Sequence, residues 1–222
     1  HVVSQQRKAI FFFYLLYMTY CALCHGDEGE GYKADGANAL NHPAFLAIAS
    51  DELLTTSIER GRPGTPMSAW GEALGGPLSD AQVARLVWYI RQWQSGEGLD
   101  LSDVVVEGEV SRGKPQYAAR CAGCHGDEGQ GGSFMSLNSP EFLSVVSDGY
   151  LRESIASGRA GTPMGPYVDL VPAQTIDDLV ALIRSWETPQ DDTPYVPPEV
   201  DIDNAVIHPG GPAPSIEQDL YI

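Results

Sequence analysis

Residues 21–31 read CALCHGDEGEG, and residues 121–131 read CAGCHGDEGQG. Both stretches contain a Cys-x-x-Cys-His run followed by the same acidic, glycine-rich turn. The similarity continues downstream, where residues 137–164 align with residues 40–67 without a gap. Duplication of one supersecondary unit explains this order, and each copy has its own cysteine motif.

A further match shows where each copy ends. LVALIRSW at 179–186 aligns with LVWYIRQW at 86–93, and an acidic, glycine-containing stretch separates the copies. After the second copy the chain is rich in proline and acid and has no lysine or arginine, so that segment cannot fold alone. It is either disordered, or a strap that orders against another subunit or joins a further domain. We predict a first domain over 1–94, a linker over 95–112, a second domain over 113–187 and an extended tail over 188–222.

Hydrophobic periodicity predicts the secondary structure of each copy. In the first copy, apolar residues recur at helical spacing over 40–61 and again over 79–93. Asp51 and Ser79 are the expected helix caps. Two prolines and a glycine exclude regular structure over 62–70. The second copy repeats this order, so we predict an all-α fold.

The N-terminal run AIFFFYLLYMTY at 9–20 is apolar and aromatic. It is too short to span a bilayer, and it enters Cys21 without the small-residue cleavage site of a signal peptide. We predict a helix with one face in the first core and the other against a partner or a membrane surface. An uncleaved anchor whose start lies outside this chain is the alternative, since the chain begins with His1 rather than methionine.

The net charge of the chain limits the classes of partner that it can bind. The chain of 222 residues has 30 acidic and 13 basic side chains and a formal charge of −17. This charge repels phosphate backbones and anionic lipid surfaces, which disfavours nucleic acid as a partner. It is compatible both with a solvated surface and with a patch that docks a basic protein.

The chemistry of the repeated motif is specific. Cys-x-x-Cys-His is the attachment signature of c-type haem, in which both thiols form thioethers with the porphyrin and the imidazole becomes the proximal iron ligand. A four-thiolate zinc site explains neither the histidines nor the duplication, and a thioredoxin-like dithiol needs a βαβ setting. A disulfide between cysteines three apart is strained. We predict two haem c groups, attached at Cys21, Cys24 and His25 and at Cys121, Cys124 and His125.

Gly-Thr-Pro-Met occurs at the same place in both copies and ends at Met67 and Met164. A thioether sulfur is a soft, weak iron ligand, and a stiff proline loop can hold it on the distal face of a haem. We therefore predict Met67 and Met164 as the sixth ligands, with His25, Met67, His125 and Met164 binding the two irons. Met18 and Met135 are read as core filler. His42 has Ser139 as its counterpart and is read as a capping or surface histidine.

Both copies resemble class I c-type cytochrome domains, with a first helix ending in Cys-x-x-Cys-His, a middle helix, a methionine loop and a last helix that crosses the first. The second copy has Gly113 and Tyr117 where such domains place a glycine at the helix crossing and an aromatic residue. The first copy keeps the aromatic as Tyr17 but has Phe13 instead of the glycine, so the usual close crossing is not expected there. Arg62 and Arg159 are candidates to pair with haem propionates.

This resemblance implies a dihaem electron-transfer protein rather than an enzyme, because iron with histidine and methionine on its two faces has no open position. We expect a subunit of a membrane-associated respiratory or photosynthetic complex, with other redox proteins as partners. A freely diffusing periplasmic carrier and a dihaem enzyme of the peroxidase or thiosulfate dehydrogenase type are the alternatives. The cofactor implies the bacterial periplasm or the outer face of the cytoplasmic membrane.

Overall fold

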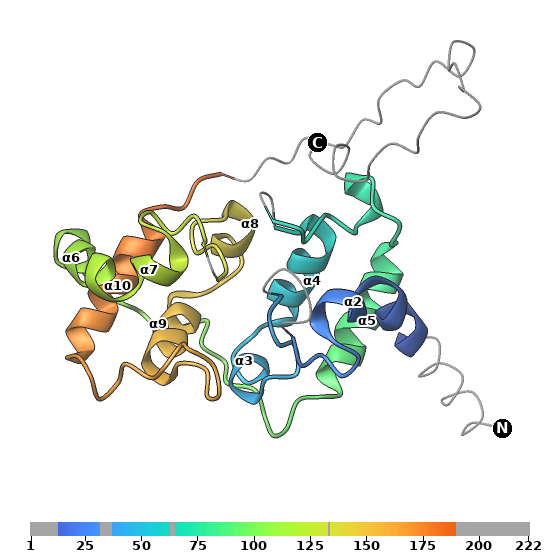
Figure 1. Cartoon of the computed structure of the whole chain (residues 1–222), viewed down its shortest axis with the longest axis horizontal. Coiled ribbons are helices and arrows are strands. Elements are labelled where there is room, and N and C mark those ends of the chain that lie inside the picture. Colours follow the sequence, from blue (N-terminus) through green and yellow to red (C-terminus); the bar gives the residue numbers. More distant parts are fainter. Residues whose placement is uncertain (1–12, 32–36, 63–64, 133, 190–222) are drawn as a thin grey trace, which may run out of the picture.

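The computed structural model describes residues 13–31, 37–62, 65–132 and 134–189. They form two helical units of the same design (Figure 1). In this part of the chain the only β-type pairing is one isolated bridge between Gly71 and Leu78, so the all-α prediction is confirmed. The first four residues of the apolar run at 9–20 and nearly all of the predicted tail lie outside the described residues.

The helices follow the predicted order in both repeats. In the first repeat a helix covers the described residues 13–20, followed by α2 (Ala22–His25), α3 (Pro43–Leu46), α4 (Asp51–Arg60), the short 3₁₀ helix η1 (Glu72–Leu74) and α5 (Asp80–Arg91). The second repeat has α6 (Val110–Arg120), α7 (Ala122–His125), α8 (Pro140–Leu143), α9 (Asp148–Ser157) and α10 (Ala173–Arg184). Because α6 begins at Val110, the last three residues of the predicted linker are helical, and the domain limits stay a prediction.

Side-chain caps fix where the helices begin. Ser79 caps α5, as predicted, and it also forms a capping box with Gln82. Asp51 is not the cap of α4: Ser50 is, and its hydroxyl accepts a 3.0 Å hydrogen bond from the Leu53 amide. Asp51 occupies the first helical position instead, where its charge favours the positive end of the helix dipole.

The first and last helices of the second repeat cross closely at Gly113. A β-carbon built on this glycine would lie 2.3 Å from the carbonyl oxygen of Asp178 in α10, which leaves no room for any side chain. The Asp178 carboxylate accepts 2.8 Å hydrogen bonds from the Glu109 amide and the Arg112 guanidinium. These bonds lower the pKa of Asp178 to about 2. The start of α6 is thus pinned to α10 by sterics and charge together.

The first repeat closes the same crossing with different residues. Phe13 replaces the glycine, and its ring centroid lies 5.3 Å from that of Trp88 in α5. Arg85, which stands where the second repeat has Asp178, places its guanidinium 5.9 Å from the Phe13 ring centroid. The close crossing is absent from the first repeat, as its missing glycine predicts, and an aromatic and a cation–π contact hold the two helices together instead.

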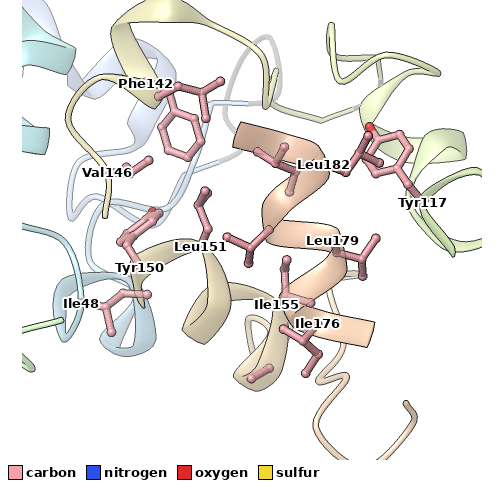
Figure 2. Close-up of a cluster of buried hydrophobic side chains, with 14 of the residues drawn as sticks. Ile48, Tyr117, Phe142, Val146, Tyr150, Leu151, Ile155, Ile176, Leu179 and Leu182 are labelled. Carbon is pink, nitrogen blue, oxygen red and sulfur yellow. The ribbon is translucent and has the colours of Figure 1, made fainter. Parts of the chain in front are cut away.

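The two repeats share a packed boundary. The hydrophobic core of the second repeat includes Ile48, Ala49 and Leu53 from the first repeat. Figure 2 shows Ile48 within this cluster, together with Tyr150 of α9. Helix α4 of the first repeat also packs against α8 of the second. Apolar burial therefore fixes the repeats against each other, since removing such surface from water is the main favourable term in association.

A bilayer span requires a long helix that is apolar over most of its length. Of the helices that the described residues form, none combines sufficient length and apolar character to cross a bilayer.

Replacing Gly113 with alanine tests the close crossing. We expect Gly113→Ala to lower the free energy of unfolding of the second repeat by about 1–3 kcal/mol, because the new methyl group meets backbone that cannot move aside. Gly123→Ala is the matched control, since a β-carbon at Gly123 meets nothing within 4 Å. Denaturant titration of the holoprotein measures both, and equal effects of the two substitutions would contradict this account.

The Asp178 charge predicts a pH dependence. Because the folded-state pKa of about 2 is below the unfolded value of about 3.9, the carboxylate stabilises the fold above about pH 4 and this contribution is lost as the pH falls toward 2. We therefore expect Asp178→Asn to be less stable than wild type near neutral pH and equally stable in strong acid. Thermal unfolding over this range measures it, and a difference that does not change with pH would argue against the ion pair.

Candidate haem-attachment sites

Each cysteine motif is a single helical turn with defined ends. Cys21 is the N-cap of α2 and its carbonyl oxygen accepts a 2.9 Å hydrogen bond from the His25 amide at the last helical position. Gly26 then leaves the helix with φ of 82°, a conformation that favours glycine. Cys121 and Gly126 bracket α7 in the same way, with φ of 81° at the glycine. The two turns are therefore equivalent.

A buried tyrosine fixes the end of each turn. The Tyr17 hydroxyl donates a 2.7 Å hydrogen bond to the Gly26 carbonyl oxygen, and Tyr117 donates one of 2.8 Å to Gly126. Tyr17 is fully buried, and burial raises its pKa, so the hydroxyl stays protonated and remains a donor. The aromatic residue four positions before each motif therefore anchors the glycine that follows the histidine.

The terminal tryptophan of each repeat packs on this tyrosine. The ring centroids of Trp93 and Tyr17 are 5.1 Å apart in an edge-on arrangement. Trp93 also covers Gly29, where a β-carbon would lie 2.5 Å from the indole ring. The last helix is thus held against the turn that follows the cysteine motif. The second repeat makes the same contacts through Trp186, Tyr117 and Gly129.

The histidine rings are held in one tautomer. His25 Nδ1 lies 2.8 Å from the Asn38 carbonyl oxygen, and His125 Nδ1 lies 2.9 Å from the Met135 carbonyl oxygen. Because a carbonyl oxygen only accepts, Nδ1 carries the hydrogen in both rings and Nε2 keeps its lone pair. Burial lowers the pKa of His25, which favours its neutral form. A neutral imidazole with a fixed Nδ1–H is the arrangement of a metal-binding histidine.

The cysteines are suited to thioether bonds. All four are free of disulfides, and Cys21 and Cys121 are half-buried. Burial raises the pKa of Cys21 to about 12 and that of Cys121 to about 11, so both thiols stay uncharged. Among the described residues, no three His, Cys, Asp or Glu side chains converge as a metal site.

The methionine loops have one geometry in both repeats. The Thr65 hydroxyl donates to the Arg62 carbonyl oxygen at 2.7 Å and accepts from the Met67 amide at 3.2 Å. The Arg62 amide donates to the Met67 carbonyl oxygen at 2.7 Å and closes the loop. These three bonds thus hold the half-buried Met67 beside Arg62 and Thr65. The same three bonds connect Thr162, Arg159 and Met164 at 2.8, 3.1 and 2.7 Å.

Each methionine loop is tied back to its cysteine motif. Trp70, three residues after Met67, has its ring centroid 5.4 Å from that of Tyr20. At the matching place in the second repeat, the Tyr167 hydroxyl lies 3.4 Å from the Arg120 carbonyl oxygen. Tyr20 and Arg120 directly precede the first cysteine of each motif, so these contacts connect the segments that hold the predicted ligands.

An arginine in the last helix of each repeat holds the segment between two earlier helices of that repeat. No role for this arginine was predicted from the sequence. Arg91 donates to the Asp51 carboxylate at 2.7 Å and to the carbonyl oxygens of Leu46 and Ala49 at 3.0 and 2.5 Å. It therefore satisfies the carbonyls between α3 and α4. The signal was present in the sequence as an arginine two residues before the tryptophan in both copies. Arg184 makes the matching bonds to Asp148, Leu143 and Val146.

The two arginines predicted to pair with propionates lie in different surroundings. Arg159 donates to the Gly158 carbonyl oxygen and to the Ser154 hydroxyl, each at 3.0 Å. Arg62 has its guanidinium carbon 5.2 Å from the Phe142 ring centroid of the other repeat, and its Nη1 is buried with no hydrogen-bond partner in the described part of the chain. A buried cationic nitrogen without an acceptor is costly unless an anion completes it.

The residues present fit c-type haem. The fixed Nδ1–H leaves Nε2 for an iron, the uncharged thiols suit thioethers, and the Arg62 nitrogen fits a carboxylate such as a propionate. Haem has acidic propionate side chains, and the buried Arg62 nitrogen is a suitable partner for one of them.

The remaining candidates have structural contacts. Met18 is half-buried and packs against the first core, as expected for core filler. Met135 packs against the second core, but it also supplies the His125 acceptor. His42 caps α3, with Nδ1 accepting from the Ala44 amide at 3.2 Å, so the capping prediction is confirmed. Its Nε2 also donates to the Ala160 carbonyl oxygen of the second repeat at 2.9 Å, which the sequence did not reveal.

Comparison with known proteins identifies the family. The model of the family described as cytochrome C oxidase, cbb3-type, subunit III, matches residues 14–90 and 108–183. The chain belongs to this family. Subunit CcoP of a cbb3-type cytochrome c oxidase from Azospirillum sp. (strain B510) is 30% identical over an alignment of 159 positions, and the match covers 64% of this chain and 50% of that protein. Subunit FixP from Bradyrhizobium sp. (strain ORS 278) is 30% identical over an alignment of 149 positions, and the match covers 64% of this chain and 49% of that protein.

The chain spans about half the length of these curated relatives. Among solved structures, a chain of a reducing HAO-like protein complex from Kuenenia stuttgartiensis matches with a TM-score of 0.50 at 20% identity. The match covers 79% of this chain and 96% of that one, and it supports the cytochrome c-like fold alone. Membership of the cbb3 subunit III family, with two matched regions, means that the chain carries covalently bound haem c in its two repeats.

Removing one hydroxyl tests the tyrosine anchor. We expect Tyr17→Phe to lower the free energy of unfolding of the first repeat by about 1–2 kcal/mol, because the buried Gly26 carbonyl oxygen loses its donor. Tyr167→Phe is the control, since its hydrogen bond of 3.4 Å is exposed and water can replace the lost donor. Chemical denaturation of the two holoprotein variants is the measurement, and an unchanged stability of Tyr17→Phe would show that the hydrogen bond is dispensable.

Proposed function

We propose that this chain transfers single electrons between redox proteins through two c-type haems, one in each repeat. The observation that carries the proposal is the duplication of a complete ligand frame: a histidine with Nδ1 fixed by a carbonyl, and a methionine in a proline loop closed by the same three hydrogen bonds. A site closed on both faces exchanges electrons without binding a substrate. Haem c supplies reversible one-electron chemistry when bound.

The residues have distinct roles in this proposal. Cys21 and Cys24 would hold one haem through thioethers, and His25 and Met67 would bind its iron. Hydrogen bonding of Nδ1 to a carbonyl raises the basicity of the ligating imidazole, whereas a thioether ligand raises the reduction potential. Cys121, Cys124, His125 and Met164 have the same roles in the second repeat.

We further propose that the chain is the electron-transfer part of a membrane-bound oxidase and lies on the periplasmic side. The relatives named above are subunits of cbb3-type cytochrome c oxidases. The helix over 13–20 adds support, because Tyr14 and Leu15 are 39% and 44% exposed and Trp88 of α5 is 43% exposed. An apolar face of this kind is suited to another subunit or to the membrane interface. In this proposal the chain serves an oxidoreductase complex and has no catalytic site of its own.

The subunit proposal is tested in membranes. Membranes solubilised in mild detergent are separated on a native gel, stained for haem and analysed by mass spectrometry. We expect the chain in a large haem-staining band together with oxidase subunits. Recovery as a small soluble species would favour a diffusing carrier instead.

Opening one iron tests the ligand assignment. We expect Met164→Ala to bind carbon monoxide in the reduced state at one of the two haems, because the substitution removes the sixth ligand. Met18→Ala is the matched control and, like wild type, is expected to bind none, since Met18 only packs in the first core. Absorption difference spectra measure binding. Rapid carbon monoxide binding by the wild-type protein would overturn the assignment and favour a dihaem enzyme.

A further inference from the structure

The loops that supply the hydrogen-bond acceptors of His25 and His125 meet at the boundary between the repeats. Asn38 Nδ2 donates a hydrogen bond to the Met135 sulfur, 3.8 Å away, across 97 positions of the sequence. The two residues occupy equivalent positions, since each stands two residues before the aligned leucines, Leu40 and Leu137. Equivalent positions that touch each other are the feature expected on the axis of a two-fold pairing.

These are also the two residues that orient the histidines. The Asn38 carbonyl oxygen accepts from His25 Nδ1 at 2.8 Å, and the Met135 carbonyl oxygen accepts from His125 Nδ1 at 2.9 Å. The side-chain contact therefore completes an unbroken chain of hydrogen bonds and covalent bonds from one imidazole to the other. Four residues from two repeats make this chain: His25, Asn38, Met135 and His125.

The surrounding contacts hold this bridge in place. His42 of the first repeat donates to the Ala160 carbonyl oxygen in the second repeat, and the Arg62 guanidinium lies over the Phe142 ring. Asn38 and Met135 are themselves half-buried, so water competes less for the amide donor. A thioether is a weak acceptor, and the bond by itself is small. Its position matters more, because it joins the two acceptor loops directly. These are the loops that contain Asn38 and Met135, whose carbonyl oxygens accept the histidine hydrogen bonds.

We propose that Asn38 and Met135 are positioning residues that couple the two haem sites. The proposal rests on the proposed function, in which His25 and His125 are iron ligands. A side chain that only filled the core would not affect the other repeat. A bridge between the two acceptor loops does, because a shift of either residue moves the carbonyl that orients its own histidine and pulls on the other loop. Coupling of this kind is reciprocal, so the redox state of each site biases the potential of the other.

The test uses the full holoprotein and three variants. Asn38→Leu removes the donor and Met135→Leu removes the sulfur, and both keep similar side-chain volume and the backbone carbonyls. The third variant combines the two substitutions. Asn41→Leu is the matched control, because Asn41 Nδ2 donates at 2.9 Å to the Glu28 carbonyl oxygen within its own repeat. Proton NMR during a redox titration follows each haem separately, with signals assigned through Met67→His and Met164→His.

We expect Asn38→Leu to shift the potential and haem signals of the second repeat, and Met135→Leu to shift those of the first. In the combined variant these cross-repeat shifts should not add, since both substitutions remove the same contact. Asn41→Leu should affect the first repeat alone. Cross-repeat shifts that are absent, or that add fully in the combined variant, would overturn the bridge.

The two proposals fail in different ways. If the wild-type spectrum has two histidine- and methionine-ligated haems but the variants act only within their own repeat, the bridge is wrong and the proposed function stands. If the wild-type spectrum lacks these haems, the proposed function is wrong and the bridge falls with it.

Discussion

The hydrogen bond from a buried tyrosine to the glycine after each cysteine motif is the constraint on which the rest of each site depends. It fixes the end of a turn only four residues long, and the histidine is the last residue of that turn. The terminal tryptophan packs on the same tyrosine, so the last helix and the motif form one body. Because the tyrosine and the tryptophan fix the backbone of the turn, one hydrogen bond from Nδ1 to a carbonyl oxygen is enough to fix the orientation of the imidazole.

The repeats keep this inner frame and differ where the helices cross behind it. In the second repeat the crossing needs Gly113 and the carboxylate of Asp178, whereas the first uses Phe13 and Arg85 at the same places. One solution approaches backbone to backbone and the other stacks a cation on a ring. Both hold the first helix against the last, which indicates that the crossing itself, rather than particular residues, is what the motif needs.

Much of this could be predicted from the sequence because it is local or repeated. The cysteine motif, the proline loop and the helical periods each depend on neighbours in the chain, and duplication made the methionines recognisable. The contacts between repeats were not predictable, because the Asn38 amide and the Met135 sulfur are distant in sequence. Neither an asparagine nor a methionine indicates by its type which residue it will contact. Met135 was read as filler for that reason. The cap of α4 was misplaced by one residue because serine and aspartate compete for the same position.

The central claim is that both irons are closed by histidine and methionine, which makes the chain an electron-transfer protein. Electron paramagnetic resonance of the oxidised holoprotein tests this most directly, since it reports the spin state of each ferric haem. We expect two low-spin signals of the histidine–methionine type and no high-spin signal. A high-spin component at the level of one haem would show an open iron and contradict the claim.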